Sequence, residues 1–255
     1  MTALVLAGTR PGGDPLAAHS GVSHKTLIDI CGTPMLERVV RAVAASPSVG
    51  RILVSIERPE LVAALPPTGV PVIAMPAAAG PSASVGAALA SEGTPLLVTT
   101  GDHALLEPEW IEEFVAAAPA DADAVIALAL RHAVEASAPQ TQRTYLRFAD
   151  GEYSGCNLFL LRTPDARGVV ALWQDIEAKR KRPLAMLRRL GLGYALRYRL
   201  GALTLGDALG RLGQLSRAQI RAVILRDGRA AIDVDKPADL DLVRRLLTPS
   251  PPSPP

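Results

Sequence analysis

Aromatic residues are scarce in this sequence of 255 residues: phenylalanine, tryptophan and tyrosine together account for 4%, although 49% of the residues are hydrophobic. A core built from such a sequence consists mainly of aliphatic side chains, and the length suffices for a well-buried domain. There are only two cysteines, Cys31 and Cys156, and they lie in no CxxC or Cys/His spacing. They are typical of buried thiols in a reducing compartment, and we expect no structural zinc site.

An excess of one charge is also lacking, because 27 lysine and arginine residues and 25 acidic residues leave a net charge of +2. Without a strongly basic surface we expect no nucleic acid partner. No apolar run approaches the roughly 18 to 20 residues that span a bilayer. Residues 1–8 are apolar but lack the basic residues of a signal peptide. We therefore expect a cytoplasmic monomer or homodimer with no transmembrane segment.

Short apolar runs alternate with helical patterns through the first half of the chain. The runs predict strands over residues 2–7, 51–56, 70–74, 96–100 and 123–130. The intervening patterns predict helices over residues 34–45, 82–91 and 108–118. This rhythm indicates an α/β protein with a Rossmann-like, three-layer α/β/α fold around a mostly parallel, mixed sheet.

The second half of the chain is less regular. It predicts antiparallel strands over residues 143–148 and 157–161, a helix over 163–178, strands over 223–225 and 230–233, and a last helix from 237 to 246. A helical insertion is expected over about residues 183–219. We expect one domain over residues 1–247, followed by a disordered proline and serine tail over 248–255.

A glycine-bearing loop follows the first predicted strand. Near Gly8, backbone N–H groups can approach phosphate oxygens without obstruction by a Cβ atom. Arg10 and Lys25 could supply positive charge to a triphosphate. The alternative is an ordinary turn that carries two solvated cations. A second loop leads into the helix at Ser82 and Ser84, where N–H and hydroxyl groups could bind a nucleotide or only cap the helix.

Carboxylates occur in two places where a parallel sheet would bring them to one edge. Asp102 directly follows the buried strand that ends before Gly101, and ligands of open α/β sheets bind at this edge. Asp233 and Asp235 alternate in a predicted strand, which would place both on one face. Such a pair tolerates its own repulsion better beside a cation. The alternative for Asp233 and Asp235 is a polar edge strand.

These segments resemble the MobA-like and sugar-phosphate nucleotidyltransferases. That family has a Leu-Ala-Gly glycine loop with an arginine, then Pro-Lys-x-Leu, and a Gly-x-Pro-Met/Leu-Leu helix start. The matching residues here are Leu6-Ala7-Gly8, Lys25-Thr26-Leu27 and Gly32-Thr33-Pro34-Met35-Leu36. Arg10 comes earlier than the arginine of the family pattern. The segment from Asp233 to Leu240 resembles the Asp-x-Asp-Thr-Pro-Glu-Asp-Leu motif of cytidylyltransferases, with Lys236 in place of threonine.

The resemblance implies a GT-A-like fold and transfer of an NMP unit from an NTP to a small phosphorylated acceptor. CTP is favoured, with GTP and UTP as alternatives. Lys25, Arg10 and Asp102 would act in catalysis, and Mg²⁺, or alternatively Mn²⁺, would be held by Asp102, Asp233 and Asp235. Asp233 could be a metal ligand or a partner of one. The implied nucleotide-binding residues are Leu6, Ala7, Gly8, Thr9, Arg10, Lys25, Gly80, Pro81, Ser82, Ser84, Gly101 and Asp102.

Acceptor recognition has two candidate segments. The stretch from Gly155 to Phe159 resembles the Gly-Gly-Asn-x-Phe segment of the family, so Asn157 could orient the acceptor. Lys179 and Lys181 belong to a run of four cations that could neutralise an acceptor phosphate. The alternative for this run is a solvated helix end.

Three other functions fit the sequence less well. A Rossmann dehydrogenase needs G-x-G-x-x-G and an acidic residue about 20 positions later, which this loop lacks. A metal-dependent glycosyltransferase of the same fold normally carries its Asp-x-Asp in the middle of the chain. A regulatory nucleotide-binding module would be expected to have lost the carboxylates that are present here.

Overall fold

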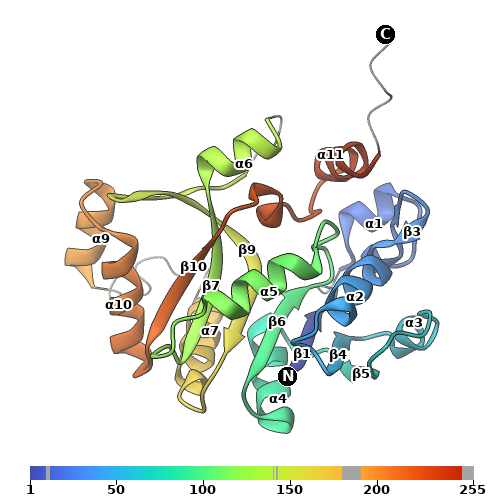
Figure 1. Cartoon of the computed structure of the whole chain (residues 1–255), viewed down its shortest axis with the longest axis horizontal. Helices are drawn as coiled ribbons and strands as arrows, with labels where there is room; N and C mark the ends of the chain where they lie inside the picture. Colours follow the sequence, from blue (N-terminus) through green and yellow to red (C-terminus); the bar gives the residue numbers. More distant parts are fainter. Residues whose placement is uncertain (10–11, 140, 142, 180–190, 249–255) are drawn as a thin grey trace.

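The computed structural model describes residues 1–9, 12–139, 141, 143–179 and 191–248 (Figure 1). Its largest sheet has the order β10-β7-β9-β6-β1-β4-β5, and β8 pairs with β9. The strands are β1 (Thr2–Leu6), β4 (Arg51–Ile56), β5 (Val72–Pro76), β6 (Leu96–Thr100), β7 (Ala124–Leu130), β8 (Leu146–Phe148), β9 (Gly151–Leu161) and β10 (Ile220–Leu225).

The sheet is mostly parallel, as the sequence predicts. β1 pairs in parallel with β4 and β6, and β4 with β5, while β7 and β10 form a second parallel pair. β9 runs antiparallel between β6 and β7 and joins the two parallel groups. Because β9 runs in the opposite direction, its first half lies near the carboxyl ends of the parallel strands.

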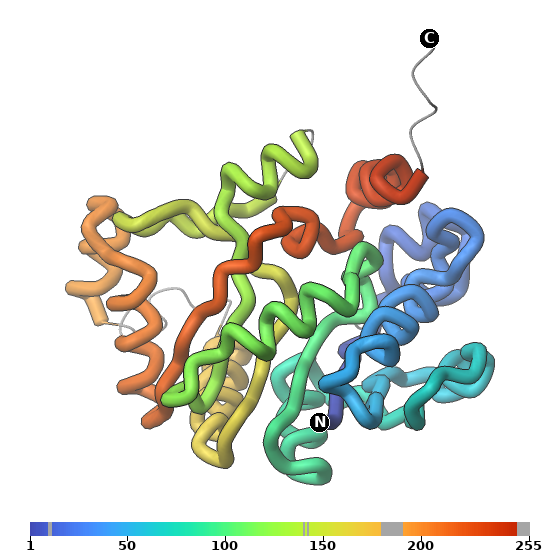
Figure 2. The backbone as a smooth tube through the Cα atoms, in the orientation of Figure 1, coloured from blue at the N-terminus to red at the C-terminus, as the bar shows by residue number. Residues whose placement is uncertain are grey.

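Helices cover both faces of the sheet. One face packs against α2 (Met35–Ala45) and α5 (Pro108–Ala117), and the other against α4 (Pro81–Glu92) and α7 (Ala166–Lys179). The side chains of β1 alternate between the two faces of the sheet. Ala3 and Val5 belong to the core cluster that includes α2 and α5, and Leu4 belongs to the cluster that includes α4 and α7. The tube drawing in Figure 2 shows the same three layers, and the predicted α/β/α fold is confirmed.

Further elements gather near one edge of the sheet (Figure 1). They include α1 (Pro15–His19), α6 (Arg131–Ser137) and α11 (Pro237–Leu247). The remaining elements are η1 (Lys25–Leu27), β2 (Asp29–Ile30), β3 (Thr33–Pro34), α3 (Pro59–Ala63), α9 (Leu192–Arg199), α10 (Leu205–Ser216) and η2 (Gly228–Ala231). Within the range of the predicted insertion the structure has α9 and α10, and residues 183–190 lie outside the described residues.

The predicted strand over residues 230–233 is wrong. The chain forms η2 there, because the Asp227 carboxylate accepts a hydrogen bond from Arg229 N at 2.9 Å and Gly228 packs against the backbone of Ala133. The strand predicted over residues 143–148 begins only at Leu146, and Arg143 turns away toward Asp233. Both differences concern the segments that border the candidate site.

Several expectations concern residues outside the described ranges. These are Arg10, Lys181 and residues 249–255 of the predicted tail. Within the described part of the chain, no helix combines the length and the apolar character that crossing a membrane requires.

Candidate functional site

The loops after β1 and β6 lie directly against each other. Gly101 N donates a hydrogen bond to Leu6 O at 2.8 Å, which extends the β1–β6 pairing by one residue. A Cβ atom on Gly101 would lie 3.1 Å from that of Ala7, so a larger residue would push the two loops apart. Glycine at this position therefore brings Asp102 next to the glycine loop.

The glycine loop is anchored to the end of β4. Thr9 N donates to Glu57 Oε2 at 3.1 Å, and the Thr9 hydroxyl lies 2.8 Å from Nε2 of the buried His24. His24 also contacts Glu57 Oε1 at 3.1 Å. Burial raises the pKa of Glu57, but backbone and Thr9 hydrogen bonds outweigh it and lower that pKa. Neither Glu57 nor His24 has a role that the sequence predicts, since neither belongs to a recognisable motif.

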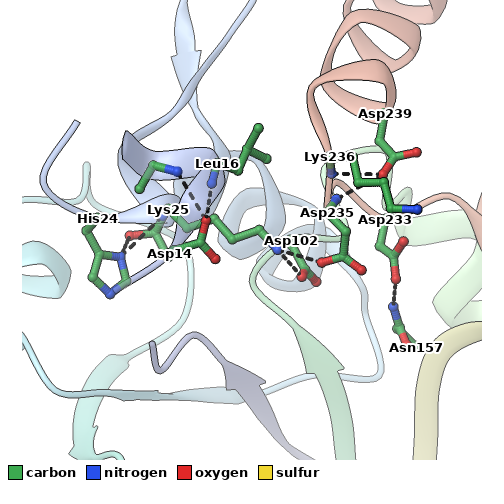
Figure 3. A network of polar contacts seen from close by, with 12 residues as sticks. Asp14, Leu16, His24, Lys25, Asp102, Asn157, Asp233, Asp235, Lys236 and Asp239 are labelled. Atoms are coloured by element: carbon green, nitrogen blue, oxygen red, sulfur yellow. Dashed lines mark hydrogen bonds and ion pairs between the residues drawn. The ribbon is translucent and has the colours of Figure 1, made fainter. Parts of the chain in front are cut away.

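Lys25 connects the two carboxylate segments. It begins η1, where the His24 ring accepts a hydrogen bond from Thr26 N. Its ammonium lies 2.7 Å from Asp102 Oδ2 and 2.9 Å from Asp235 Oδ1 (Figure 3). Burial lowers the pKa of Lys25, but the two carboxylates outweigh this effect and raise its pKa above the ordinary value. The lysine is therefore a permanent cation at neutral pH.

The carboxylates of Asp102 and Asp235 have the chemistry of a partial metal site. Oδ1 of Asp102 is buried and has no hydrogen-bond partner among the described residues, so this carboxylate lacks a full set of contacts. No group of three or more His, Cys, Asp or Glu side chains within those residues is arranged to hold an ion. Mg²⁺ commonly takes only one or two carboxylates and completes its shell with phosphates and waters. Asp102 and Asp235 could supply these two carboxylates.

Asp233 is held differently from its two neighbours. Its Oδ1 forms an ion pair with Arg143, and its Oδ2 accepts a hydrogen bond from Asn157 Nδ2 at 2.8 Å. Burial raises the pKa of Asp233, Arg143 opposes this shift, and Asp102 and Asp235 add to it. Because both of its oxygens already have partners, Asp233 is better suited to orienting the segment than to binding an ion. Its position next to Asp235 comes from the extended chain after η2 and not from a strand.

Asn157 reaches Asp233 because β9 is irregular at this point. The β7–β9 register shifts between Ile126 and Leu128, and Asn157 has a φ of 50°. Asparagine adopts this left-handed conformation more readily than most residues, and such irregularities are common at binding sites.

A polar pocket of about 310 Å³ opens beside Asn157. It is lined by Arg143, Thr144, Ser154, Gly155, Asn157, Asp233, Asp235, Lys236 and Asp239. Of these, Asp239 accepts hydrogen bonds from Asp235 N and Lys236 N and so fixes the start of α11. Lys179, which we expected near the acceptor, is not among the lining residues and pairs with Asp175 on its own helix.

The start of α4 lies on the other side of the glycine loop. A Cβ atom on Gly8 would lie 3.1 Å from that of Ala77, which precedes the Gly80-Pro81 start of this helix. Ser84 Oγ accepts a hydrogen bond from Ala78 N at 3.0 Å, and Ser82 donates to the Glu177 carboxylate. Through Ala77, the segment before α4 thus lies next to Gly8, while Ser82 and Ser84 themselves contact Glu177 and Ala78.

His103 follows Asp102 but belongs to the core. It is 1% exposed, and its ring stacks on Trp110 at a centroid distance of 6.1 Å. Burial lowers the pKa of His103 to about 4. We therefore assign His103 a packing role.

Comparison with known proteins shows the family of the chain. A family model described as the MobA-like NTP transferase domain matches residues 3–212. A structure described as a hypothetical transferase from Thermus thermophilus has 33% identity and a TM-score of 0.80, covering 94% of this chain and 98% of that chain.

Two less similar structures share the fold. The 4-diphosphocytidyl-2C-methyl-D-erythritol synthase from Anaerococcus prevotii has 11% identity and a TM-score of 0.59, covering 96% of this chain and 97% of that chain. The CMP:2-keto-3-deoxy-manno-octonic acid synthetase, in complex with CTP, has 17% identity and a TM-score of 0.58, covering 97% and 98%. From the family match over most of its length and the similarity to the Thermus transferase, we conclude that the chain belongs to the MobA-like NTP transferase domain family.

Proposed function

We propose that this protein transfers an NMP unit from an NTP to a small phosphorylated acceptor and releases pyrophosphate. The observation that carries the proposal is the meeting of Lys25, Asp102 and Asp235 between the glycine loop and the polar pocket. A triphosphate on the glycine loop would lie beside Lys25. An acceptor in the pocket would approach the same point from the side of Asn157.

The chain's own groups suffice for alignment and charge neutralisation. An acceptor phosphate is already ionised at neutral pH, so its oxygen can attack the α-phosphorus without a general base. Lys25 and the N–H groups of the loop would stabilise negative charge on the departing pyrophosphate. When bound, Mg²⁺ at Asp102 and Asp235 supplies further neutralising charge to the phosphates. Asp233, held by Arg143 and Asn157, would keep the segment of Asp235 in place.

We propose CTP as the NTP. The Asp-x-Asp-x-Pro-x-Asp-Leu sequence from Asp233 to Leu240 supports this choice, and so do two proteins of the same fold whose names refer to cytidyl compounds. The start of α4, with Ser82 and Glu177, is the proposed position of the nucleoside. GTP and UTP are the alternatives, and they are distinguished by comparing the NTPs as substrates.

The pocket lining supports a hydrophilic acceptor. Apart from Gly155, every lining side chain is polar or charged, and two cations, Arg143 and Lys236, border the space. A lipid or a flat aromatic acceptor would find more polar than apolar surface there to contact. A phosphorylated sugar, polyol or hydroxy acid fits the volume and the chemistry.

A pyrophosphate-release screen tests the proposal. It combines four NTPs with panels of phosphorylated sugars, polyols and acids, in the presence of Mg²⁺ or Mn²⁺. We expect release only with an acceptor present, and fastest with CTP. Release of a nucleoside diphosphate from a nucleotide-sugar, with no pyrophosphate from any NTP, would instead support the glycosyltransferase alternative.

A further inference from the structure

We infer that Lys25 is an internal cation that occupies the site between Asp102 and Asp235 until metal and nucleotide arrive together. The nucleotide-free protein should then bind divalent cations weakly, and Lys25 should be the cause. This inference rests on the proposed metal site. It concerns the order of binding and not the identity of the nucleotide or acceptor.

The first support is the position of the ammonium group. Lys25 Nζ lies within hydrogen-bond distance of both carboxylates, at 2.7 Å from Asp102 and 2.9 Å from Asp235. The side chains of Lys25 and Asp102 are 15% and 23% exposed, so their ion pair is shielded from much of the solvent, whereas Asp235 is 59% exposed. Figure 3 shows Lys25 extending from η1 toward these two side chains. The ammonium thus lies where an ion bridging the same oxygens would lie.

The second support is the accessibility of Asp102. Its Oδ1 is buried, whereas Oδ2 is the oxygen that accepts the hydrogen bond from Lys25. An ion from solvent would therefore approach Asp102 at Oδ2, the oxygen that is already bonded to Lys25. A divalent cation within a few ångströms of an ammonium is repelled strongly in such a partly buried place. Lys25 has to move away before the ion can take both carboxylates.

The third support is that the two carboxylates need a cation in every state. A backbone hydrogen bond from Val234 N to Asp102 O, at 3.0 Å, holds the two segments together without any ion. Like charges held this close destabilise each other unless a positive group lies beside them. Lys25 fulfils that need in the nucleotide-free protein. A triphosphate then offers the lysine new anionic partners, so that metal and nucleotide favour each other's binding.

Direct measurement of Mn²⁺ binding by electron paramagnetic resonance, without nucleotide, tests the inference. Lys25→Met keeps the length of the side chain and removes its charge. We expect this variant to bind Mn²⁺ more than about tenfold more tightly than the wild type. Lys236→Met is the matched control, because Lys236 borders the same pocket but is not the cation that joins the two carboxylates. It should change Mn²⁺ affinity by less than about threefold.

A second arm adds α,β-methylene CTP. The wild type should gain more Mn²⁺ affinity from the analogue than Lys25→Met gains, because only the wild type has a lysine to relocate. Equal or weaker Mn²⁺ binding by Lys25→Met without nucleotide would overturn the inference. An increase in Mn²⁺ affinity in Lys236→Met equal to that in Lys25→Met would also overturn the inference. Lys25→Gln repeats the test if the methionine variant unfolds in a circular-dichroism melt. If the analogue does not bind but Lys25→Met still binds Mn²⁺ more tightly, the inference about Lys25 holds and the proposed use of CTP is wrong.

Discussion

Lys25 Nζ lies 2.9 Å from Oδ1 of Asp235, although the two residues are 210 positions apart in the sequence. The contact joins η1, near the start of the chain, to the segment that leads into α11. The proposed site therefore depends on the native packing of both ends of the chain, and changes at either end should affect it.

Replacement of Asp102 by asparagine should nearly abolish turnover. The variant keeps the shape of the side chain but removes the charge at the end of β6 that Lys25 and an ion would contact. We expect kcat for pyrophosphate release to fall at least about 100-fold. Circular dichroism should show a native fold. Activity like that of the wild type, in a folded variant, would contradict the role of this carboxylate.

Replacement of Lys25 by alanine should weaken the use of the triphosphate. Loss of a charged hydrogen-bond donor costs about 1.5–3 kcal/mol, or about 10- to 150-fold in kcat/KM for the NTP. Because the carboxylates hold the pKa of Lys25 above its ordinary value, the effect should be constant from about pH 6 to 9. Steady-state kinetics over this range provide the check, and unchanged kcat/KM would count against the assignment.

The ion pair between Arg143 and Asp233 should show strong coupling. The side chains are 12% and 16% exposed, so removing either partner leaves the other charge largely buried. Arg143→Met and Asp233→Asn should each lower the free energy of unfolding by about 3–5 kcal/mol. The loss of unfolding free energy in the double variant should be smaller than the sum of the two single losses, by more than about 1 kcal/mol. Urea unfolding measures all three changes, and additive losses would show that the pair is not coupled.

Gly228 should tolerate no larger residue. A Cβ atom there would collide with the backbone of Ala133, and the chain from this glycine leads to Asp233 and Asp235. Gly228→Ala should lower the free energy of unfolding by about 1–3 kcal/mol and reduce activity. Gly210→Ala in α10 is the control, since no atom beyond its chain neighbours and the adjacent helix backbone lies within 4 Å of its added Cβ. It should stabilise the helix by about 0.5–1 kcal/mol. Equal effects of both substitutions on unfolding would argue against the close contact.

The position of Asp102 at the carboxyl edge of the sheet could be predicted from the sequence for a simple reason. Parallel strands have their carboxyl ends at one edge of the sheet, and a run such as β6 followed by Gly101 marks that edge. The alternation of apolar runs and helical patterns likewise predicts the layers. These features depend on local residue patterns, which a single sequence contains.

The surroundings of Asp233 could not be predicted in the same way. Arg143 lies in an irregular segment before β8 and belongs to no motif, and its contact with Asp233 depends on the turn at η2. The position of Asn157 depends on the register shift between β7 and β9 and on a left-handed backbone. The anchoring of Thr9 by Glu57 depends on the neighbouring ends of β1 and β4. All three are tertiary effects that periodicity does not encode.

A crystal grown with Mn²⁺ and α,β-methylene CTP would show the proposed chemistry at the site itself. Anomalous scattering locates the ion without reference to the surrounding density. We predict an Mn²⁺ peak between the carboxylates of Asp102 and Asp235, with phosphate oxygens completing its shell and Lys25 turned toward the triphosphate. A nucleotide bound elsewhere, or carboxylates that still hold Lys25 with no ion between them, would contradict the proposed site.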